Sequence, residues 1–372
     1  MSPQKNPISS IGLPSSEVLL LGPGPSPVSP RVREALGAPA RSHLDPEFMA
    51  VLDDVRERLG RVFRAPAGSL TSAISGTGTS GMETVVANLT EPGMCALVVV
   101  TGYFGERLAQ MFERYGAAVE RLQVEWGTAV DPEAVAQALR DGQFNVVGLV
   151  HVETSTGVVN PVAEIAAIAH QHDALCVLDA VTSLGAMPLD TAAAGVDAAY
   201  SCSQKGLGAP SGLAPVMFAP SALARRVKAR SFYFDLDLLE SYWVGRKYHH
   251  TMSAPLLFAL HTALCETEDE GLDARWGRHE RHHQQFVEGL TSRGWSLLPA
   301  PAARAWSLNA VRIPAGADDA AVRRRLLTEH RIEIGAGLGP LAGKVWRVGL
   351  MGAGSTEGNV QAVLNALQEA TH

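Results

Sequence analysis

Short apolar segments and helical patterns alternate along the middle of the chain, and this alternation limits the possible folds more than any other feature. The segments that read as buried strands are Ala96–Val100, Ala118–Leu122, Val146–Val150, Leu175–Leu178, Ala198–Ser201 and Pro215–Phe218. The helical patterns among them fall at Gly81–Leu89, Gly105–Tyr115, Pro132–Arg140, Val162–His170 and Ala222–Ala229. Strands linked in this way form a mainly parallel sheet with helices on both faces. The sequence therefore predicts an α/β fold.

The pattern changes after about residue 252, which predicts a second domain. A long helical stretch covers roughly 254–293, and a strand, a helix, a strand and a final helix follow near 305–313, 318–330, 345–350 and from 356. A chain of 372 residues is also longer than one core usually supports. We therefore expect an N-terminal arm rich in Ser and Pro at 1–17, a large domain at 18–265 and a smaller C-terminal α+β domain at 266–372.

Charge and cysteine content indicate the kind of partner and compartment. A net charge of −7 disfavours nucleic acid or an anionic membrane as the main partner. The cysteines are far apart with no C-x-x-C spacing, which is typical of reduced thiols; they are Cys95, Cys176, Cys202 and Cys265. The N-terminus lacks a signal-peptide pattern, and no apolar run is long enough to span a bilayer. A cytoplasmic protein that binds neither nucleic acid nor membrane is the expectation.

A lysine and an aspartate follow neighbouring predicted strands. Lys205 opens a loop of small residues that ends at Gly212, and Asp179 ends an apolar strand. Ligands of open α/β sheets bind at the carboxyl ends of strands. A lysine among small, apolar groups can form a Schiff base with an aldehyde, and a buried acid needs a cation such as a protonated pyridine. The alternatives are a solvated Lys205 and an Asp179 that caps a helix.

The segment from Ser75 to Glu83 predicts an anion site. Its small residues open a helix, where free N–H groups and the helix dipole favour a phosphate, with Gly78 and Thr79 as donors. The segment also satisfies G-x-G-x-x-G, so a dinucleotide is an alternative. That fingerprint expects an acid at the end of the next strand, and the residues there, Val98 to Gly102, include none.

Arg347 and several histidines are further candidates. Arg347 lies inside a short apolar strand and needs an anion, either a substrate carboxylate or an acid of the chain. His249 and His250 are adjacent, so on a strand they would point to opposite faces. His279 and His282 share one helical face, but Arg278 and Arg281 flank them, which favours a solvated face. We expect no metal site.

With these residues in place, the chain resembles the alanine–glyoxylate / serine–pyruvate aminotransferase family of class V, fold-type I enzymes, which depend on pyridoxal 5'-phosphate (PLP). The resemblance extends from Leu20 to Leu350, and its most specific stretches are Tyr200-Ser-Cys-Ser-Gln-Lys205 and Tyr248-His-His-Thr251. It implies a large PLP-binding domain with a seven-stranded sheet between helices, a small C-terminal domain and a homodimer.

The resemblance also implies roles for individual residues. Lys205 matches the lysine that binds the PLP aldehyde, and Asp179 matches the partner of the pyridine nitrogen. The other positions that match cofactor contacts are Gly78, Thr79, Phe104, Thr154, Ser183, Gln204, Tyr248 and Thr251, of which Tyr248 and Thr251 would reach the site of the neighbouring subunit. Arg347 matches the arginine that holds the substrate carboxylate, with Gly24 and Thr154 beside it.

Two positions depart from the family pattern. Phe104 stands where relatives often have a tryptophan stacked on the ring, so we expect stacking over a smaller area. Thr79 stands where the mammalian enzymes have a histidine, and this difference leaves the preferred amino donor open.

The activity implied is transfer of an amino group from alanine or serine to glyoxylate or pyruvate, by a ping-pong mechanism through pyridoxamine phosphate. A transaminase for a ureidoglycine or aminoethylphosphonate donor and a PLP-dependent lyase are alternatives. A cysteine desulfurase needs a nucleophilic thiol late in the chain, and no cysteine follows Cys265. A binding module without catalysis would leave the lysine, the acid and the phosphate loop unexplained.

Overall fold

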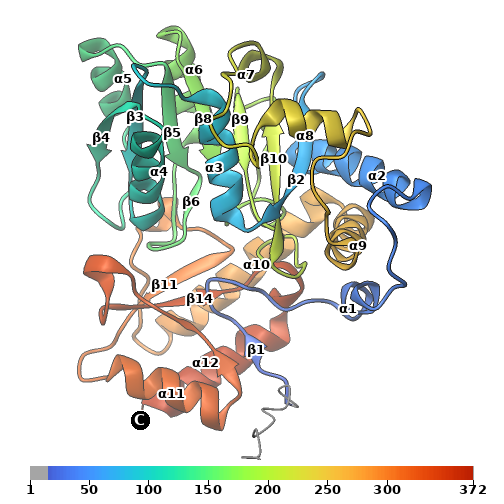
Figure 1. Ribbon diagram of the computed structural model, residues 1–372. Helices are drawn as coiled ribbons and strands as arrows, with labels where there is room; N and C mark the ends of the chain where they lie inside the picture. Colours follow the sequence, from blue (N-terminus) through green and yellow to red (C-terminus); the bar gives the residue numbers. More distant parts are fainter. Residues whose placement is uncertain (1–15, 372) are drawn as a thin grey trace, which may run out of the picture.

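The large domain is built on one seven-stranded sheet. The computed structural model describes residues 16–371 (Figure 1). In spatial order the strands are β2 (Leu70–Gly76), β10 (Gly212–Phe218), β9 (Ala198–Tyr200), β8 (Leu175–Asp179), β5 (Val146–Val150), β3 (Cys95–Val100) and β4 (Ala118–Gln123). Only β10 runs antiparallel to its neighbours in this sheet. The predicted α/β fold with a mainly parallel seven-stranded sheet is confirmed.

Alternate residues of each strand face opposite sides of the sheet and pack against different helices. In β3, Leu97 and Val99 join one buried cluster, and Val98 and Val100 join the other. The first cluster includes side chains of α2 (Pro46–Phe63), α5 (Pro132–Asp141), α6 (Val162–Gln171) and α9 (Ala254–Glu270). The second includes side chains of α3 (Gly78–Leu89), α4 (Tyr103–Arg114) and α8 (Leu236–Trp243). The sheet is therefore covered on both faces, and its strand ends are left for a site.

The small domain has its own core. Its sheet consists of β11 (Leu308–Arg312), β14 (Val345–Gly349) and β13 (Gly335–Ala336). Helices α10 (Leu272–Thr291), α11 (Asp319–Glu329) and α12 (Glu357–Thr371) pack beside it, and Phe286, Trp346 and Leu364 are fully or almost fully buried there. Figure 1 shows this domain below the carboxyl ends of the large sheet.

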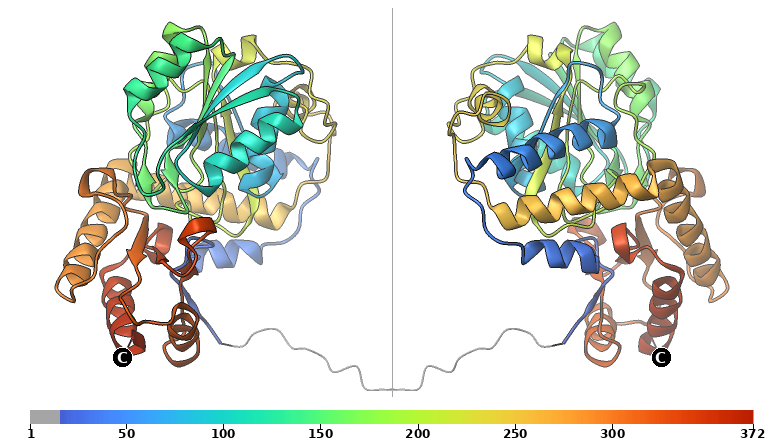
Figure 2. Two further views of the ribbon diagram at one scale, coloured as in Figure 1. Left: turned by 90° about the vertical axis from the view of Figure 1, so that its left-hand side faces the viewer. Right: turned by 90° about the vertical axis from the view of Figure 1, so that its right-hand side faces the viewer.

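Two features of the structure bear on the predicted domain limits. The strand β1 (Leu19–Leu20) pairs with β12 (Ile332–Glu333), and Leu21 joins the core of the small domain. The N-terminal segment therefore begins in the small domain before it crosses to the large one. Most of the expected arm, residues 1–15, lies outside the described residues. The expected boundary at 265 falls inside α9, and the long helical stretch breaks at Gly271, whose φ is +80°. Figure 2 shows α9 along the lower side of the large domain and α10 beside the small one.

The remaining elements are short. They are α1 (Pro30–Leu36), β6 (Val152–Glu153), β7 (Val158–Val159) and α7 (Pro220–Ala224), with 3-10 turns at Pro301–Ala303, Gly339–Leu341 and Gly352–Gly354. The helix predicted at Ala222–Ala229 starts earlier, at Pro220, and ends at Ala224, where Arg225 leaves the helix.

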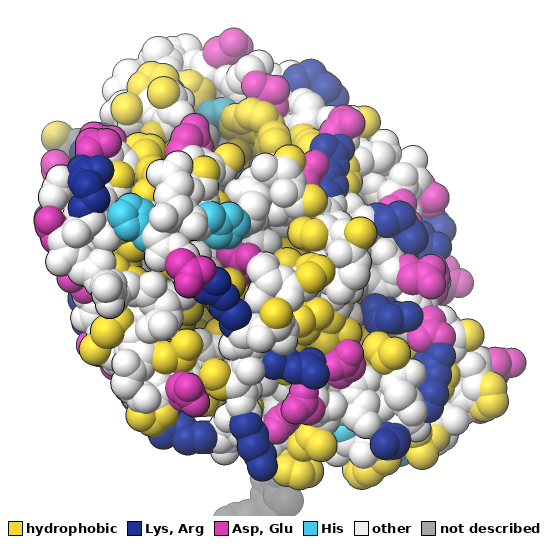
Figure 3. Space-filling view, turned by 90° about the horizontal axis from the view of Figure 1, so that it is seen from above, with side chains coloured by type: hydrophobic (Ala, Val, Ile, Leu, Met, Phe, Trp, Pro, Cys, Tyr) yellow, Lys and Arg dark blue, Asp and Glu magenta, His cyan; other side chains and the backbone are white. Residues whose placement is uncertain are grey.

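The surface carries charges of both signs. On the face seen in Figure 3, cationic and anionic side chains lie among each other. Ion pairs such as Arg226–Glu240 and Arg121–Glu113 are frequent. No helix within residues 16–371 is both long and apolar enough to cross a membrane.

Candidate active site

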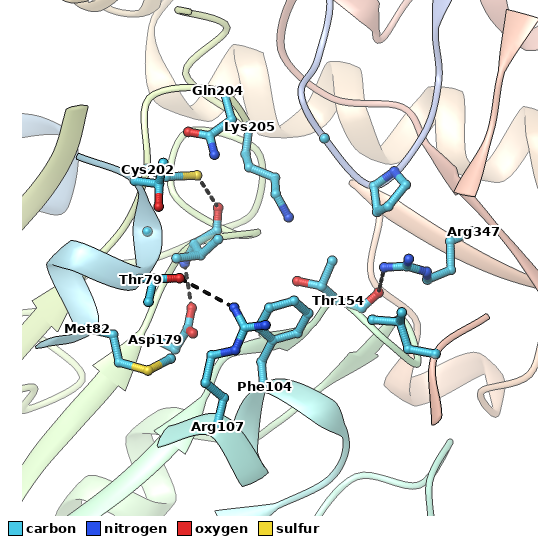
Figure 4. Close-up of a pocket in the computed structure, with 16 residues that line it drawn as sticks. Thr79, Met82, Phe104, Arg107, Thr154, Asp179, Cys202, Gln204, Lys205 and Arg347 are labelled. Carbon is cyan, nitrogen blue, oxygen red and sulfur yellow. Dashed lines mark hydrogen bonds between the residues drawn. The ribbon is translucent and has the colours of Figure 1, made fainter. Parts of the chain in front are cut away.

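One cavity lies at the carboxyl ends of the sheet strands and collects side chains from three parts of the fold. Its volume is about 300 Å³. Its lining comes from the N-terminal segment, the large domain and the small domain: Pro23, Gly24, Thr77, Gly78, Thr79, Met82, Phe104, Arg107, Thr154, Asp179, Val181, Cys202, Gln204, Lys205, Leu338 and Arg347. Figure 4 shows Lys205, Asp179, Phe104 and Arg347 around the same space.

Lys205 is buried at this cavity, so the alternative of a solvated lysine is wrong. Only 7 % of the residue is exposed, and its Nζ donates to the Thr182 hydroxyl at 3.3 Å. Burial lowers the pKa of its ammonium group. The N-terminal segment holds its backbone, because the Ser26 hydroxyl donates to the Lys205 carbonyl at 2.8 Å. A Cβ on Gly24 would lie 2.7 Å from the Lys205 side chain, so only glycine leaves this amine room. Its burial and lowered pKa favour the neutral amine, the form that acts as a nucleophile.

Asp179 is a buried acid at the end of β8. The residue is 2 % exposed. Its carboxylate accepts hydrogen bonds from the Val181 N–H at 2.8 Å and from the Tyr200 hydroxyl at 2.9 Å. Burial raises the pKa of Asp179 to about 6, although both hydrogen bonds oppose the rise. Turns, and no helix, follow it, so the helix-cap alternative is wrong. A cationic group in the cavity would satisfy this carboxylate.

The start of α3 forms an anion site beside Asp179. The N–H groups of Gly78 and Thr79 have no acceptor within the described chain, and the cap residue Thr77 makes no side-chain bond. A Cβ on Gly78 would lie 3.0 Å from Val181, so glycine permits close approach. The buried Gln204 Oε1 also has no partner among the described residues. Free donors at a helix start favour a phosphate or carboxylate.

Arg347 enters the cavity from β14 of the small domain. The residue is 8 % exposed; its Nε donates to the Ala336 carbonyl at 2.7 Å and its Nη1 to the Thr154 carbonyl at 3.4 Å. Burial lowers the pKa of Arg347 to about 10. It makes no ion pair with any described acid, so the internal salt bridge is wrong and the guanidinium is left for an external anion.

Three residues of this site were not foreseen. The Thr182 hydroxyl accepts a hydrogen bond from the Lys205 amine and lies 2.5 Å from the Thr154 hydroxyl. Thr182 therefore links Lys205 to Thr154. Glu153 is fully buried and accepts the N–H groups of Phe104 and Gly105 at 3.3 and 3.1 Å, so it sets the start of α4 and the Phe104 ring. An acid three residues after the end of the apolar strand β5 is the sequence signal that could have found Glu153.

Arg107 is the third unforeseen residue, and it adds positive charge to the cavity. Its guanidinium lies 5.0 Å from the centre of the Phe104 ring and donates to the Thr79 hydroxyl at 3.4 Å. It lies one helical turn after Phe104 on α4, and this spacing places both on one face. Figure 4 shows it between Phe104 and Thr79.

Three predicted cofactor contacts do not line the cavity. Ser183 is fully buried, and its hydroxyl has no partner within the described chain. Thr182, its neighbour, faces Lys205 instead. Tyr248 is 62 % exposed and Thr251 is exposed, and both lie outside the lining of this chain's own cavity.

The histidines are placed differently from the expectation. His279 is fully buried, so the solvated face is wrong for it; its Nδ1 donates to the Arg275 carbonyl at 2.7 Å. His250 is buried and lies 2.9 Å from the Ser75 hydroxyl. One group of possible metal ligands occurs within residues 16–371, at Asp54, His261 and Cys265. The same Asp54 oxygen already accepts from Arg58 at 2.8 Å and faces His261 at 2.6 Å, and the Arg58 charge opposes a cation.

Comparisons with known proteins agree on one family. The family model "Aminotransferase class-V" matches residues 31–362. A solved structure of alanine–glyoxylate aminotransferase from Nostoc sp. has a TM-score of 0.94 and 42 % identity, and covers 100 % of this chain and 98 % of that one. The (S)-ureidoglycine–glyoxylate transaminase of Bacillus subtilis is 34 % identical over 94 % of this chain and 89 % of its own length. Alanine–glyoxylate aminotransferase of Drosophila melanogaster is 35 % identical over 94 % and 91 %.

Proposed function

The chain belongs to the class-V aminotransferases, which use PLP, and we propose that its cavity carries out amino-group transfer with Lys205 as the catalytic lysine. The observation that carries this proposal is the burial of the Lys205 amine in one cavity with Asp179 and the open start of α3. These three groups match the three polar parts of PLP: its aldehyde, its ring nitrogen and its phosphate.

The lining residues fit PLP in size and chemistry. The N–H groups of Gly78 and Thr79 would hold the phosphate, with Gln204 beside them. Asp179 would pair with the protonated pyridine nitrogen, a cation that removes the cost of its burial. Phe104 would cover one face of the ring. Thr154 and Thr182, whose hydroxyls meet beside the Lys205 amine, would bind near the ring oxygen.

When bound, PLP supplies an electron sink that stabilises negative charge on the substrate Cα. The protein residues supply position and proton movement. Arg347 would hold the substrate carboxylate in two parallel hydrogen bonds and so orient the Cα–H bond toward Lys205. Lys205 would take that proton as a base and return it as an acid, and the lowered pKa of its ammonium group favours the base form. Asp179 would hold the proton on the ring nitrogen.

We propose alanine or serine as amino donor and glyoxylate or pyruvate as acceptor, in a ping-pong sequence through pyridoxamine phosphate. A cavity of about 300 Å³ that must also hold PLP leaves room for only a small acid. Relatives named alanine–glyoxylate aminotransferase support this choice. The Bacillus subtilis relative supports ureidoglycine as a second donor. Arg107 and the Thr79 hydroxyl add polar groups that a ureido substituent could use.

We further propose a cytoplasmic homodimer in which Tyr248 and Thr251 complete the neighbouring site. The exposure of the Tyr248 ring supports a partner surface, because large exposed aromatic side chains often mark interfaces. The cysteines, all free thiols, support a reducing compartment.

Two measurements test the proposal. Borohydride reduction of the PLP-loaded protein, followed by peptide mapping, should place the label on Lys205, and a label elsewhere or none would refute the catalytic assignment. A panel of alanine, serine and ureidoglycine as donors with glyoxylate should yield glycine. If none of the three donors gives glycine, the substrate choice is wrong, although the assignment of Lys205 would stand.

A further inference from the structure

A buried arginine outside the cavity connects the two loops that carry its chemistry. Arg275 lies in the first turn of α10 and is 5 % exposed. Its Nε donates to the Gly185 carbonyl at 2.9 Å and its Nη2 to the Gly206 carbonyl at 2.7 Å. Gly206 directly follows Lys205, and Gly185 belongs to the loop that follows Asp179 and contains Thr182.

The two loops already touch where Arg275 joins them. A Cβ on Gly206 would lie 2.4 Å from the Leu184 carbonyl oxygen, so their backbones are in direct contact. On the cavity side of this contact the Lys205 amine meets the Thr182 hydroxyl. A movement of either loop would therefore change the position of the Lys205 amine relative to Asp179 and Thr182.

Glu270 offsets the free-energy cost of burying the Arg275 charge. Its carboxylate accepts from Arg275 Nη1 at 2.8 Å and from Arg278 Nε at 2.5 Å. Arg278 Nη1 donates to the Ser355 carbonyl at 2.7 Å, in the loop after β14. The two arginines thus share one counter-ion and one helix, but they bind different loops.

We propose that Arg275 is a positioning residue for the catalytic lysine: it sets the Lys205 amine against Thr182 and Asp179 by holding the Gly185 and Gly206 carbonyls from behind. The inference rests on the proposed role of Lys205. A guanidinium suits this position because its planar fork reaches two carbonyls and a carboxylate at once, and a lysine ammonium lacks that geometry.

Arg275→Met and Arg278→Met form a matched pair of variants that tests the inference. Each removes one partner of Glu270 and leaves the other, and Arg275→Met should cost more stability because its side chain is more deeply buried, 7 % exposed against 22 %. In PLP-loaded Arg275→Met we expect the pH midpoint of the cofactor absorption band to move by about one unit, because the environment of Lys205 changes. The single-turnover rate with alanine should fall roughly tenfold to a hundredfold, as misplacement of a catalytic group does. Arg278→Met should move the midpoint less, because Arg278 contacts the Lys205 loop only through Gly352, whose carbonyl it binds at 3.2 Å.

The outcomes separate the possible failures. Equal shifts of the midpoint in both variants would mean that Arg275 only supports the fold, and an unchanged midpoint and rate in Arg275→Met would also refute the inference. If Arg275→Met does not fold, Arg275→Lys keeps the charge beside Glu270 and the same two readouts apply. Borohydride labelling of the wild-type protein is the control: without a label on Lys205 the proposed function fails, and with it only the role of Arg275 is in question.

Discussion

Lys205, Asp179 and Arg347 are ionisable side chains that the fold removes from water. Burial disfavours the charged form of each: it lowers the pKa of Lys205, raises that of Asp179 to about 6 and lowers that of Arg347 to about 10. Such groups cost free energy in the empty protein, and a ligand of complementary charge recovers it. The cavity is thus prepared for an aldehyde, a ring cation and a carboxylate.

Asp179→Asn should separate stability from cofactor binding. The folded pKa of Asp179 lies above its ordinary 3.8, so the folded protein without PLP holds the extra proton, and its stability falls as pH rises from about 4 to about 6. At pH 8 the variant without PLP should therefore be more stable than wild type, by at most about 3 kcal/mol. Affinity for PLP and turnover should fall, turnover by roughly a hundredfold or more.

Thermal unfolding at pH 4 and pH 8, with and without PLP, measures both effects. The gain of the variant should be present at pH 8 and small at pH 4. If Asp179→Asn binds PLP as tightly as wild type, the ring nitrogen does not face Asp179.

Arg347→Met should weaken the binding of every acidic substrate. A charge-assisted hydrogen bond contributes about 1.5–3 kcal/mol, so we expect KM to rise roughly tenfold to a hundredfold for donor and acceptor alike. Steady-state kinetics with alanine and glyoxylate give both values. The PLP absorption band should remain unchanged, because Arg347 lies on the substrate side, and a loss of the band would place Arg347 in cofactor binding instead.

At the scale of elements, the sequence predicted strands with continuous apolar runs and missed those without them. The limits of β3, β5 and β8 agree with the prediction to within a residue. The missed strand β2 contains Thr71, Ser72 and Ser75, and these polar residues interrupt the apolar pattern of Leu70, Ala73 and Ile74. Helix α8 was missed although Asp235 caps it, because its single apolar face covers only two turns.

The candidate site was predictable where one residue carries a chemical group, and not where the position depends on tertiary contacts. Lys205, Asp179, Gly78 and Arg347 were found by residue type and by their place in or beside the predicted strands and helices. The choice between Ser183 and Thr182 depends on which side of a turn faces Lys205, and neither periodicity nor composition gives that direction. The burial of His279 was missed for the same reason, since its cover comes from the distant loop at Gly352.

The junction of α9 and α10 should show an acid-dependent stability. Burial alone would raise the pKa of Glu270, but the bonds and charges of Arg278 and Arg275 outweigh it and hold the pKa near 2. A folded pKa below the ordinary 4.5 gives stability that is present above about pH 5 and is lost as pH falls toward 2. Glu270→Gln should lower the melting temperature by several degrees at pH 7 and by much less at pH 3.

Melting curves of wild type and Glu270→Gln across this range test the expectation. Glu268→Gln is a suitable control on the same helix, because Glu268 pairs with Arg58 and Arg61 of α2. A constant difference between wild type and Glu270→Gln at all pH values would contradict the ion-pair explanation.

At the scale of the whole molecule, the proposed dimer makes each cavity depend on two chains. Tyr248 is 62 % exposed, and its chain neighbour His249 contacts the rings of Phe232 and Tyr233, which are 73 % and 39 % exposed. Tyr248 does not reach the cavity of its own chain. If Tyr248 binds the phosphate in the neighbouring site, then Lys205 and Tyr248 of one working site come from different subunits.

Mixed dimers of Lys205→Ala and Tyr248→Ala chains test this arrangement. Each variant alone should have little activity at limiting PLP. In a mixed dimer the Lys205→Ala chain supplies an intact Tyr248 to the other chain, whose own Lys205 is intact, so one of the two sites is complete. Random exchange at equal amounts makes half of the dimers mixed, so activity should recover to about a quarter of wild type. If Tyr248 serves its own chain, the only intact Lys205 in the mixed dimer lies beside the altered Tyr248, and no recovery would follow.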